Sequence, residues 1–390
     1  MSLKHRITSI DLLRGIVMIV MALDHTRDFF HIEAFTGNAL DLQTASPQLF
    51  LTRWITHFCA PVFVFLSGTS AYLQSLRKPR KELSSFLLSR GIWLILLELT
   101  VVTLGISFDI TFNFFVLQVI WAIGISMVIL SQLIRLPFSV ILATGIIIVA
   151  GHNLLDFYES SRTDFPAWYT ILHRQDTLRL TSDHLLLVFY PFLPWTGVMI
   201  LGYCFGRFYS SHVENRNRRT FYLGAALTVL FVVLRWWDVY GDPLHWSPQK
   251  SPLYTIFSFI NTQKYPPSLL YLCMTIGPSL ILLGLFGQTK NKLTEMISVY
   301  GRVPLFYYII HFYLIHTVSA VFFLLRGHSF EEGMSGLQGS PFRFVAAGEG
   351  YDLGIVYLVW ICIVIALYPV CRWYANCKFR NNRSWWLSYL

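Results

Sequence analysis

The chain has 390 residues, of which 55% are hydrophobic and only 13% are charged, whereas soluble globular domains carry roughly 25% charged residues. Apolar runs of about 20 residues recur along the whole chain, and this is the length at which a helix crosses a bilayer. The composition excludes a soluble globular protein. The net charge of +9 does not indicate nucleic-acid binding, because the basic residues gather in the connections on one side of the predicted bundle.

Ten membrane spans are predicted in chain order, which makes the protein an all-α polytopic bundle and one domain over residues 1–390. They cover residues 8–30, 54–76, 86–107, 112–134, 137–155, 184–206, 220–240, 265–287, 303–325 and 352–374. An even number of spans places both termini on one side, and the basic connections at 77–81 and 216–219 make that side the cytoplasm. The longest connections then face outward, where a recognition surface would be built; they are 31–53, 156–183, 241–264 and 327–351.

The first span carries more ionisable groups than a lipid-facing helix tolerates. Arg14 and His25 are 11 residues apart, which places them within roughly 20° of one face and about 16 Å apart along the helix axis. Asp24 and Asp28 lie beside the histidine, where a carboxylate can fix its tautomer and raise its basicity. A structural reading remains open, because Asp11 fits a helix cap or an ion pair with Arg14 and Arg14 can snorkel to the interface.

The segment SIDLLRG, followed by MALDH, resembles the opening of the transmembrane acyltransferases related to heparan-α-glucosaminide N-acetyltransferase. The spacing Arg14-x10-His25 also matches the R-x10-H pattern of bacterial membrane acyltransferases that decorate surface glycans. The likeness extends to Arg53-Trp54 through HFCAPVFVFLSGTSAYL, to NTQKYPPSLLYL and to GRVPLFYYIIHFYLIH.

This resemblance implies transfer of an acyl group, usually acetyl, from cytosolic acyl-CoA to an amine or hydroxyl of a glycan or amino sugar across the bilayer. His25 would be the general base. In the lysosomal branch, the position matching His25 resembles an Asn and the working His lies downstream in an aromatic stretch. The sequence DFFH places His31 in such a stretch, so His31 is the second candidate. The short segment before the first span and the lack of a large luminal domain suit a member from a bacterial inner membrane, and the resemblance admits a homodimer.

The predicted site has three groups of residues. The catalytic group is His25, Asp24, Asp28 and His31. The group expected to bind acyl-CoA is Arg14, Asp11, Ser67, Lys264 and His311. The group expected to bind the acceptor is Arg53, Trp54, His57, Asn261 and Tyr265.

Several of these residues have simpler explanations. Ser67 lies among small residues that usually mark close helix packing, although the same residues would leave room for a pantetheine arm. His311 and His316 lie about 140° apart around one helix, so one is expected to line the site and the other to bond between helices. No metal is predicted, because the sequence has no H-x-x-x-H or H-E-x-x-H spacing.

Two other functions compete with acyl transfer. Intramembrane His, Asp and Arg also mark proton-coupled transporters, although the sequence shows no pair of inverted halves. A structural role, in which the polar groups only hold helices together, is the third reading. The acceptor, the acyl chain length, and the choice between direct transfer and an acyl-histidine intermediate stay open.

Overall fold

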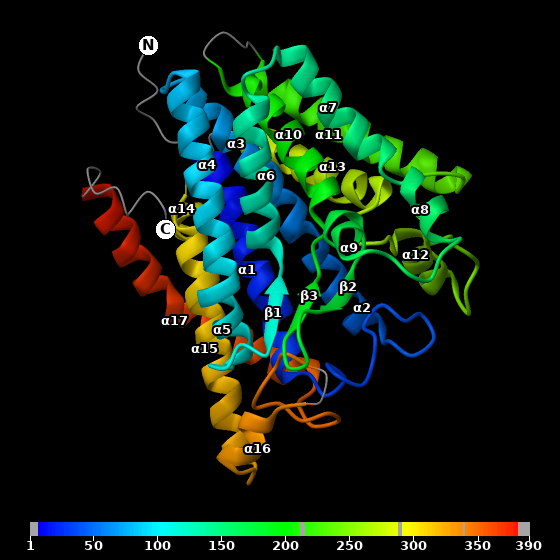
Figure 1. Cartoon of the computed structure of the whole chain (residues 1–390), viewed down its shortest axis with the longest axis vertical. Helices are drawn as coiled ribbons and strands as arrows, with labels where there is room; N and C mark the ends of the chain where they lie inside the picture. The colour runs from blue at the N-terminus through cyan, green and yellow to red at the C-terminus, as the bar shows by residue number, and fades with distance from the viewer. Residues whose placement is uncertain (1–6, 211–214, 288–290, 338–339, 381–390) are drawn as a thin grey trace. The chain divides into compact units, whose positions relative to one another are not determined.

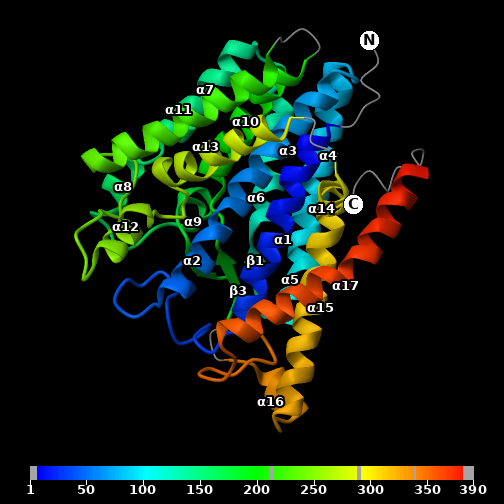
Figure 2. The same ribbon diagram turned by 180° about the vertical axis from the view of Figure 1, so that it is seen from behind.

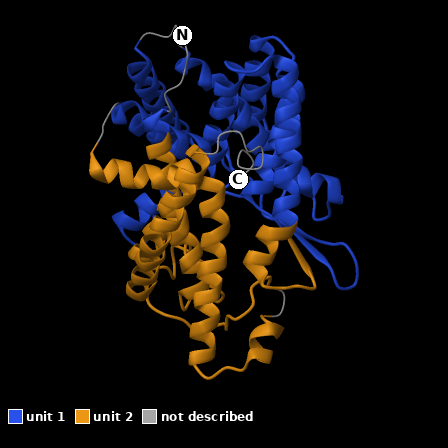
Figure 3. Ribbon diagram, turned by 90° about the vertical axis from the view of Figure 1, so that its left-hand side faces the viewer, with its two compact units in different colours: residues 1–10, 60–99, 116–289 blue, residues 11–59, 100–115, 290–390 orange. Residues whose placement is uncertain are grey.

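The computed structural model describes residues 7–210, 215–287, 291–337 and 340–380, and these are mostly helical (Figure 1). The chain divides into two compact units, which Figure 3 shows in different colours. Unit 1 comprises residues 1–10, 60–99 and 116–289, and unit 2 comprises residues 11–59, 100–115 and 290–390. The single domain expected over residues 1–390 stays a prediction.

The helices of unit 1 supply most of the apolar spans. They are α3 (Cys59–Ser75), α4 (Arg80–Leu97), α6 (Val119–Leu133), α7 (Phe138–Gly151), α8 (Leu154–Glu159), α9 (Ala167–His173), α10 (Phe192–Phe205), the 3-10 helix η3 (Gly206–Tyr209), α11 (Arg216–Trp237), α12 (Pro252–Ile260) and α13 (Leu269–Phe286). Within this unit α4 packs on α6, α10 packs on both α6 and α7, and α11 packs on α13.

Small residues allow these helices to approach closely. A Cβ atom on Gly68 of α3 would lie 2.0 Å from the carbonyl oxygen of Met199 in α10. The neighbouring Thr69 donates its hydroxyl to the Gly202 carbonyl oxygen at 3.1 Å. Close backbone approach at small residues is the usual way in which membrane helices pack. The packing explanation for the small residues around Ser67 is therefore confirmed.

Two predicted spans begin as strands and not as helices. A three-stranded sheet in the order β1-β3-β2 is formed by β1 (Phe114–Leu117), β2 (Asp176–Arg179) and β3 (Leu185–Val188). Strands β2 and β3 are antiparallel, with Asp176 opposite Val188 and Arg179 opposite Leu185. The helical prediction was therefore wrong at the starts of 112–134 and 184–206, because a short apolar run fits a strand as well as a helix.

Unit 2 contains the charged first helix. Its helices are α1 (Thr8–Phe30), α2 (Pro47–Ile55), the 3-10 helix η1 (Thr56–Phe58), α5 (Thr103–Ser107), α14 (Lys292–Arg302), α15 (Pro304–Leu325), α16 (Phe330–Ser335) and α17 (Leu353–Arg380); the π-helical segment η2 (Glu98–Val102) leads into α5. Side-chain caps start some of them: Ser46 accepts from the Leu49 N–H at the start of α2, and Asn291 forms a capping box with Thr294 at the start of α14.

Helix α1 is held by close contacts with α14 and α17 (Figure 2). A Cβ atom on Gly301 of α14 would lie 1.8 Å from the Asp11 carbonyl oxygen, and one on Gly15 would lie 2.1 Å from the Ile297 carbonyl oxygen. The indole N–H of Trp360 in α17 donates to the Ile19 carbonyl oxygen at 2.8 Å. These contacts fix the helix that carries His25.

Six helical segments of the described chain are long and apolar enough to cross a membrane. They are Pro47–Ser75, Arg80–Ser107, Arg216–Trp237, Leu269–Phe286, Pro304–Leu325 and Leu353–Arg380. Helices α6 and α7 are apolar but shorter, and α1 has 23 residues but includes five Asp and Arg side chains. Each of the ten predicted spans contains a helix. The count of ten spans and the cytoplasmic termini stay predictions.

Candidate functional site

The charged stretch of the first predicted span forms one unbroken helix, α1, in unit 2. Arg14 and His25 therefore lie on one continuous helix, and their 11-residue spacing places them on the same face of it. The ring of His25 is half-buried. It stacks on Phe312 of α15 with ring centroids 4.1 Å apart, and Tyr308 meets it edge-on at 6.2 Å. The site is thus built between α1 and α15.

His25 pairs with a second histidine, His311. The Nδ1 atom of His25 lies 2.7 Å from Nε2 of His311, and Nδ1 of His311 lies 2.9 Å from the Tyr307 carbonyl oxygen. A carbonyl oxygen only accepts, so Nδ1 of His311 carries a proton and its Nε2, in the neutral ring, is the acceptor. His25 must then donate from Nδ1. With both rings neutral, the lone pair of His25 is therefore on Nε2.

The carboxylates beside His25 pair with guanidinium groups. Asp24 accepts from Arg27 at 3.2 Å and forms a short contact with Arg53, which α2 supplies. Asp28 accepts from Arg27 at 2.5 Å. The partner at Nδ1 of His25 is the imidazole of His311, and a role of Asp24 or Asp28 in orienting His25 stays a prediction. The two Asp and two Arg side chains form a group with no net charge at the end of α1.

Two further residues that were expected to bind the acceptor, Trp54 and His57, follow Arg53 in α2 and η1. Trp54 is half-buried and packs edge-to-face on Phe58, with ring centroids 5.3 Å apart. His57 is fully buried in η1. Arg53 forms an ion pair with Asp24 of α1. The acceptor-binding roles of all three stay predictions.

At the start of α1, Asp11 and Arg14 form the i, i+3 pair that the structural reading expected. The distance between Nη1 of Arg14 and Oδ1 of Asp11 is 4.0 Å. Asp11 is buried, and the Arg14 side chain is 17% exposed. This pairing does not test whether Arg14 also binds a substrate phosphate.

His31, the second candidate base, lies just beyond the end of α1 and takes part in a turn. Its Nδ1 accepts the Glu33 N–H at 3.2 Å, and the backbone beside it bonds with Tyr351. The ring is buried. Burial lowers the pKa of His31 below 6.5, and nearby Glu33 opposes this shift. His31 is therefore available as a neutral ring near pH 7, but its known contacts are those of a residue that closes a turn.

The two histidines of α15 have different partners. His311 contacts His25, whereas His316 lies between the carbonyl oxygens of Gly105 and Arg343, at 3.1 and 2.9 Å. The expectation that one histidine joins the site and the other bonds between chain segments matches this arrangement.

Ser67 belongs to unit 1 and has an ordinary local contact. Its hydroxyl donates to the Phe63 carbonyl oxygen at 2.8 Å, one helical turn earlier in α3. This bond satisfies the hydroxyl within its own helix. A role of Ser67 toward acyl-CoA stays a prediction.

Asn261, Lys264 and Tyr265 also belong to unit 1, in the segment before α13. The Lys264 ammonium lies 5.0 Å from the Tyr265 ring centroid. Lys264 is buried and Tyr265 is half-buried. Tyr265 packs edge-on against Tyr190 at 5.3 Å. The span predicted from residue 265 starts as a helix only at Leu269, where Ser268 caps α13 by accepting the Tyr271 N–H at 3.0 Å. Their substrate roles stay predictions.

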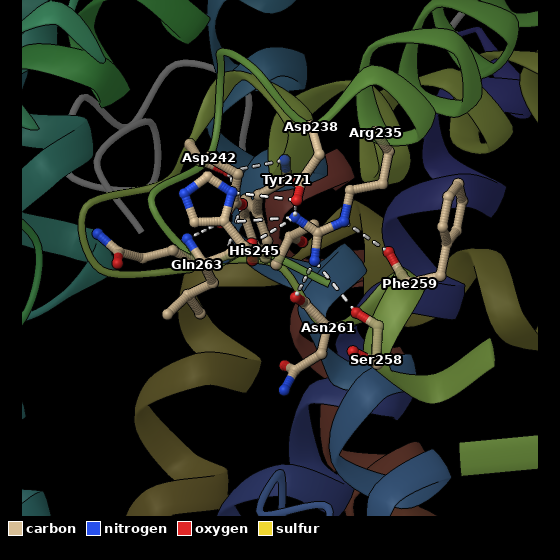
Figure 4. A network of polar contacts seen from close by, with 12 residues as sticks. Arg235, Asp238, Asp242, His245, Ser258, Phe259, Asn261, Gln263 and Tyr271 are labelled. Carbon is tan, nitrogen blue, oxygen red and sulfur yellow. Dashed lines mark hydrogen bonds and ion pairs between the residues drawn. The ribbon is translucent and has the colours of Figure 1, made fainter. Parts of the chain in front are cut away.

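Sequence reasoning missed Arg235, a fully buried arginine at the end of α11 (Figure 4). Its guanidinium donates to four backbone carbonyl oxygens, those of Phe259 (2.9 Å), Leu244 (2.5 Å), Ser258 (3.1 Å) and Asn261 (3.0 Å). It also lies 3.7 Å from Asp238 and 4.0 Å from Asp242. The only signal in the sequence was a single Arg before two Trp at the end of an apolar run.

Asp242 completes the same network. Its carboxylate accepts the Ser268 hydroxyl at 2.5 Å, the Gln263 N–H at 3.0 Å and the Leu244 N–H at 2.8 Å. Arg235 and Asp242 thus hold the backbone on both sides of Lys264. This gives the segment around Asn261 a structural explanation that its sequence alone did not provide.

Glu98 is another charged residue that the sequence left unexplained. Its two carboxylate oxygens accept the backbone N–H groups of Gln118 and Trp121, at 3.0 and 3.2 Å. The first N–H groups of a helix have no partner within the helix, so Glu98 of η2 caps α6 from outside. It needs no catalytic role.

Residues 6–235, more than half of the chain, match the family described as heparan-alpha-glucosaminide N-acetyltransferase, catalytic. The matched region contains Arg14, His25 and Arg53, and it ends before α15. No curated protein matches the chain.

Proposed function

Because the chain belongs to the heparan-α-glucosaminide N-acetyltransferase catalytic family, we propose that it is a membrane acetyltransferase in which His25 is the general base. The His25–His311 pair carries this proposal, since it directs a lone pair to Nε2 of His25. Histidine titrates near neutral pH and is the most frequent general base in enzymes. A fixed tautomer is what such a base requires.

The proposed substrates are cytosolic acyl-CoA, with acetyl as the acyl group, and a sugar amine or hydroxyl at the outer face of a bacterial inner membrane. In direct transfer, Nε2 of His25 takes the acceptor proton while the acceptor attacks the thioester carbonyl carbon. The carbon–sulfur bond then breaks, and the CoA sulfur receives the proton from His25. In a two-step route, Nε2 attacks the thioester carbon and CoA leaves as the thiolate; the acceptor then attacks the acyl carbon, the bond to Nε2 breaks, and the acceptor proton passes to the CoA thiolate. Both routes need the same lone pair.

His311 is a positioning residue in this mechanism. When Nε2 of His25 takes a proton, the Nδ1–H group becomes the donor of a charge-assisted hydrogen bond to His311, and such bonds are stronger than neutral ones. The Tyr307 carbonyl oxygen holds His311 in the tautomer that accepts this bond. His311 therefore stabilises the imidazolium without adding a charge.

The neutral group of two Asp and two Arg side chains would form the polar wall for the acceptor. Asp28 is its most exposed member, with 34% of its side chain accessible, against 9 to 17% for Asp24, Arg27 and Arg53. A carboxylate held by Arg27 can accept a hydrogen bond from a sugar hydroxyl. We therefore propose that Asp28 contacts the acceptor and that Arg53 and Asp24 fix its surroundings.

On the donor side, we propose that Arg14 contacts a phosphate of acyl-CoA. Arg14 is the basic residue of α1 on the stripe of His25, and the 4.0 Å distance to Asp11 is at the limit of an ion pair. A guanidinium binds phosphate oxygens in a bidentate manner. Ser67 and Lys264 are also proposed to bind acyl-CoA.

The test uses the purified full-length chain in lipid nanodiscs with radiolabelled acetyl-CoA and glucosamine. We expect transfer of label to the sugar by the wild type and no measurable transfer by His25→Ala. His245→Ala, which removes an exposed histidine, is the matched control and should retain transfer. Full activity in His25→Ala, with loss in His31→Ala, would identify His31 as the base and overturn our proposal.

The same purified chain in sealed proteoliposomes distinguishes acyl transfer from proton-coupled transport. With acetyl-CoA outside and glucosamine trapped inside, the acyltransferase should produce labelled sugar in the lumen without net uptake of CoA. Accumulation of an intact solute without acyl transfer would instead support the transporter.

A further inference from the structure

A second cluster of ionisable residues lies in unit 1, in the connection that follows α7. Helices α8 and α9 bring together Asp156, Glu159 and His173, and one potential ligand atom of each lies within 4.8 Å of the others. His173 is fully buried, and the two carboxylates are half-buried. The spacing of these residues in the sequence gave no sign of the group.

Hydrogen bonds from outside the group orient each of its members. Asn153 donates to Oδ2 of Asp156 at 2.7 Å, and the Tyr169 hydroxyl donates to Oε1 of Glu159 at 3.0 Å. Nε2 of His173 lies 3.0 Å from Nδ1 of His152. Partners of this kind, bound to the far side of each ligand, are typical of metal sites, where they fix the orientation of the ligands.

Among the described residues, the side chain that pairs with these carboxylates is His173, whose Nδ1 lies 2.7 Å from Oε1 of Glu159. No Lys or Arg side chain in the described residues forms an ion pair with Asp156 or Glu159. The nearby Arg162 lies over the Tyr158 ring, and Arg174 pairs with Asp176 at 3.5 Å. Burial raises the pKa of Asp156, and its hydrogen bond from Asn153 opposes this shift. Half-buried carboxylates of this kind are stabilised by a cation.

The buried residue His152 orients His173 from outside the group. It is 3% exposed, and its Nε2 has no hydrogen-bond partner in the described part of the chain. Its only polar contact through the ring is Nδ1, directed at His173. His152 therefore holds the Nε2 side of His173. A metal-binding histidine is usually held in this way by a partner at its other ring nitrogen.

We infer that Asp156, Glu159 and His173 bind a divalent transition-metal ion such as Zn²⁺ or Mn²⁺. Ligand atoms about 2.0–2.2 Å from such an ion are themselves separated by about 3–4 Å, so small side-chain rotations close the group around it. Mixed carboxylate and imidazole ligands suit these ions better than Ca²⁺. The ion would join α8 to α9, and this role is independent of the proposed acyl transfer.

Metal binding requires a change in the hydrogen bonds of His173. Without the ion, Nδ1 of His173 lies 2.7 Å from Oε1 of Glu159, within hydrogen-bond distance. As a metal ligand Nδ1 carries no proton, so this hydrogen bond is replaced by the bonds to the ion, and the proton of the neutral His173 ring is on Nε2, directed at Nδ1 of His152. Because metal ligands are deprotonated, affinity should fall as the pH is lowered.

The test is isothermal titration of the chelator-treated full-length chain with Zn²⁺, at neutral and at mildly acidic pH. We expect one ion per chain and weaker binding at the lower pH. Asp156→Asn and Glu159→Gln should each weaken binding by at least about 10-fold, whereas Asp164→Asn, at a nearby exposed carboxylate, should not. Titration with Co²⁺ should give the absorption bands of a coordinated ion.

Absence of saturable binding, or equal binding by the two ligand variants and the wild type, would show that the cluster is only a hydrogen-bonded network. Binding of Ca²⁺ as tight as that of Zn²⁺ would show oxygen ligands alone and overturn the assignment of His173. Because the readout is ion binding and not acyl transfer, failure of this inference leaves the proposed function untouched.

Discussion

Two regions of the molecule carry charged side chains on apolar helices, and they satisfy those charges differently. At the end of α11, the guanidinium of Arg235 donates to four backbone carbonyl oxygens (Figure 4). At the end of α1, Arg27 and Arg53 pair with side-chain carboxylates, and His25 pairs with the side chain of His311. Arg235 thus binds mainly backbone, with the Asp238 and Asp242 carboxylates at 3.7 and 4.0 Å, whereas Arg27, Arg53 and His25 pair with side chains.

This difference is the basis on which we propose a structural role for Arg235 and a catalytic role for His25. Backbone carbonyls neither gain nor lose protons near pH 7, so the surroundings of Arg235 hold the chain in one conformation. Two imidazoles can exchange a proton, and the pair changes its charge without a change of fold. A charged residue at membrane depth suggests function by default; the chemical type of its partners then decides whether it is functional.

The largest effect is expected for His25→Gln. The Gln amide can still donate a hydrogen bond to His311, but it cannot accept a proton from the acceptor. Turnover with acetyl-CoA should fall by about 100- to 10,000-fold, which is the usual contribution of a general base. Thermal inactivation should stay close to that of the wild type. Unchanged turnover would mean that the histidine pair is structural, like Arg235.

Arg235→Met should mainly reduce stability. It leaves Asp242 and four carbonyl oxygens without their guanidinium, and breaking a buried charged pair costs about 3–5 kcal/mol. We expect a lower yield and lower thermal stability in detergent, with turnover per folded molecule much less affected than in His25→Gln. Arg326→Met is the control, because its ion pair with Glu349 is exposed. Similar stability of the two variants would refute the structural role.

His311→Asn should have an intermediate effect. Loss of a group that orients a catalytic residue typically costs about 10- to 100-fold, and this loss should appear in kcat more than in the KM for acetyl-CoA. The pH profile of kcat should also shift, because the His25 imidazolium loses its acceptor. His316→Asn, on the same helix, removes bonds to backbone carbonyls and should lower stability without moving the pH profile.

The smallest effect is expected for Ser268→Ala. The variant removes the cap of α13 and one hydrogen bond to Asp242, and loss of an N-cap side chain costs about 1–2 kcal/mol. A modest decrease in thermal stability should result, smaller than that of Arg235→Met. A larger decrease would mean that Asp242 depends on Ser268 more than on Arg235.

The sequence by itself determined the local structure of this protein. The apolar run from Thr8 predicted an unbroken α1 and placed Arg14 and His25 on it, because a helix depends on residues within about four positions of one another. The small residues near Gly68 predicted close packing for the same reason. The family resemblance in the sequence also pointed to His25 as the base, and the experiments above test that role.

Only the tertiary structure decided the partners of the polar groups. His311 is 286 residues from His25, and no spacing in the sequence selects it over His316. Arg235 finds the carbonyl oxygens of a segment more than twenty residues away, and Asp156, Glu159 and His173 meet only because α8 and α9 fold back together. A buried polar group must be hydrogen-bonded, but which group satisfies it depends on how distant helices pack.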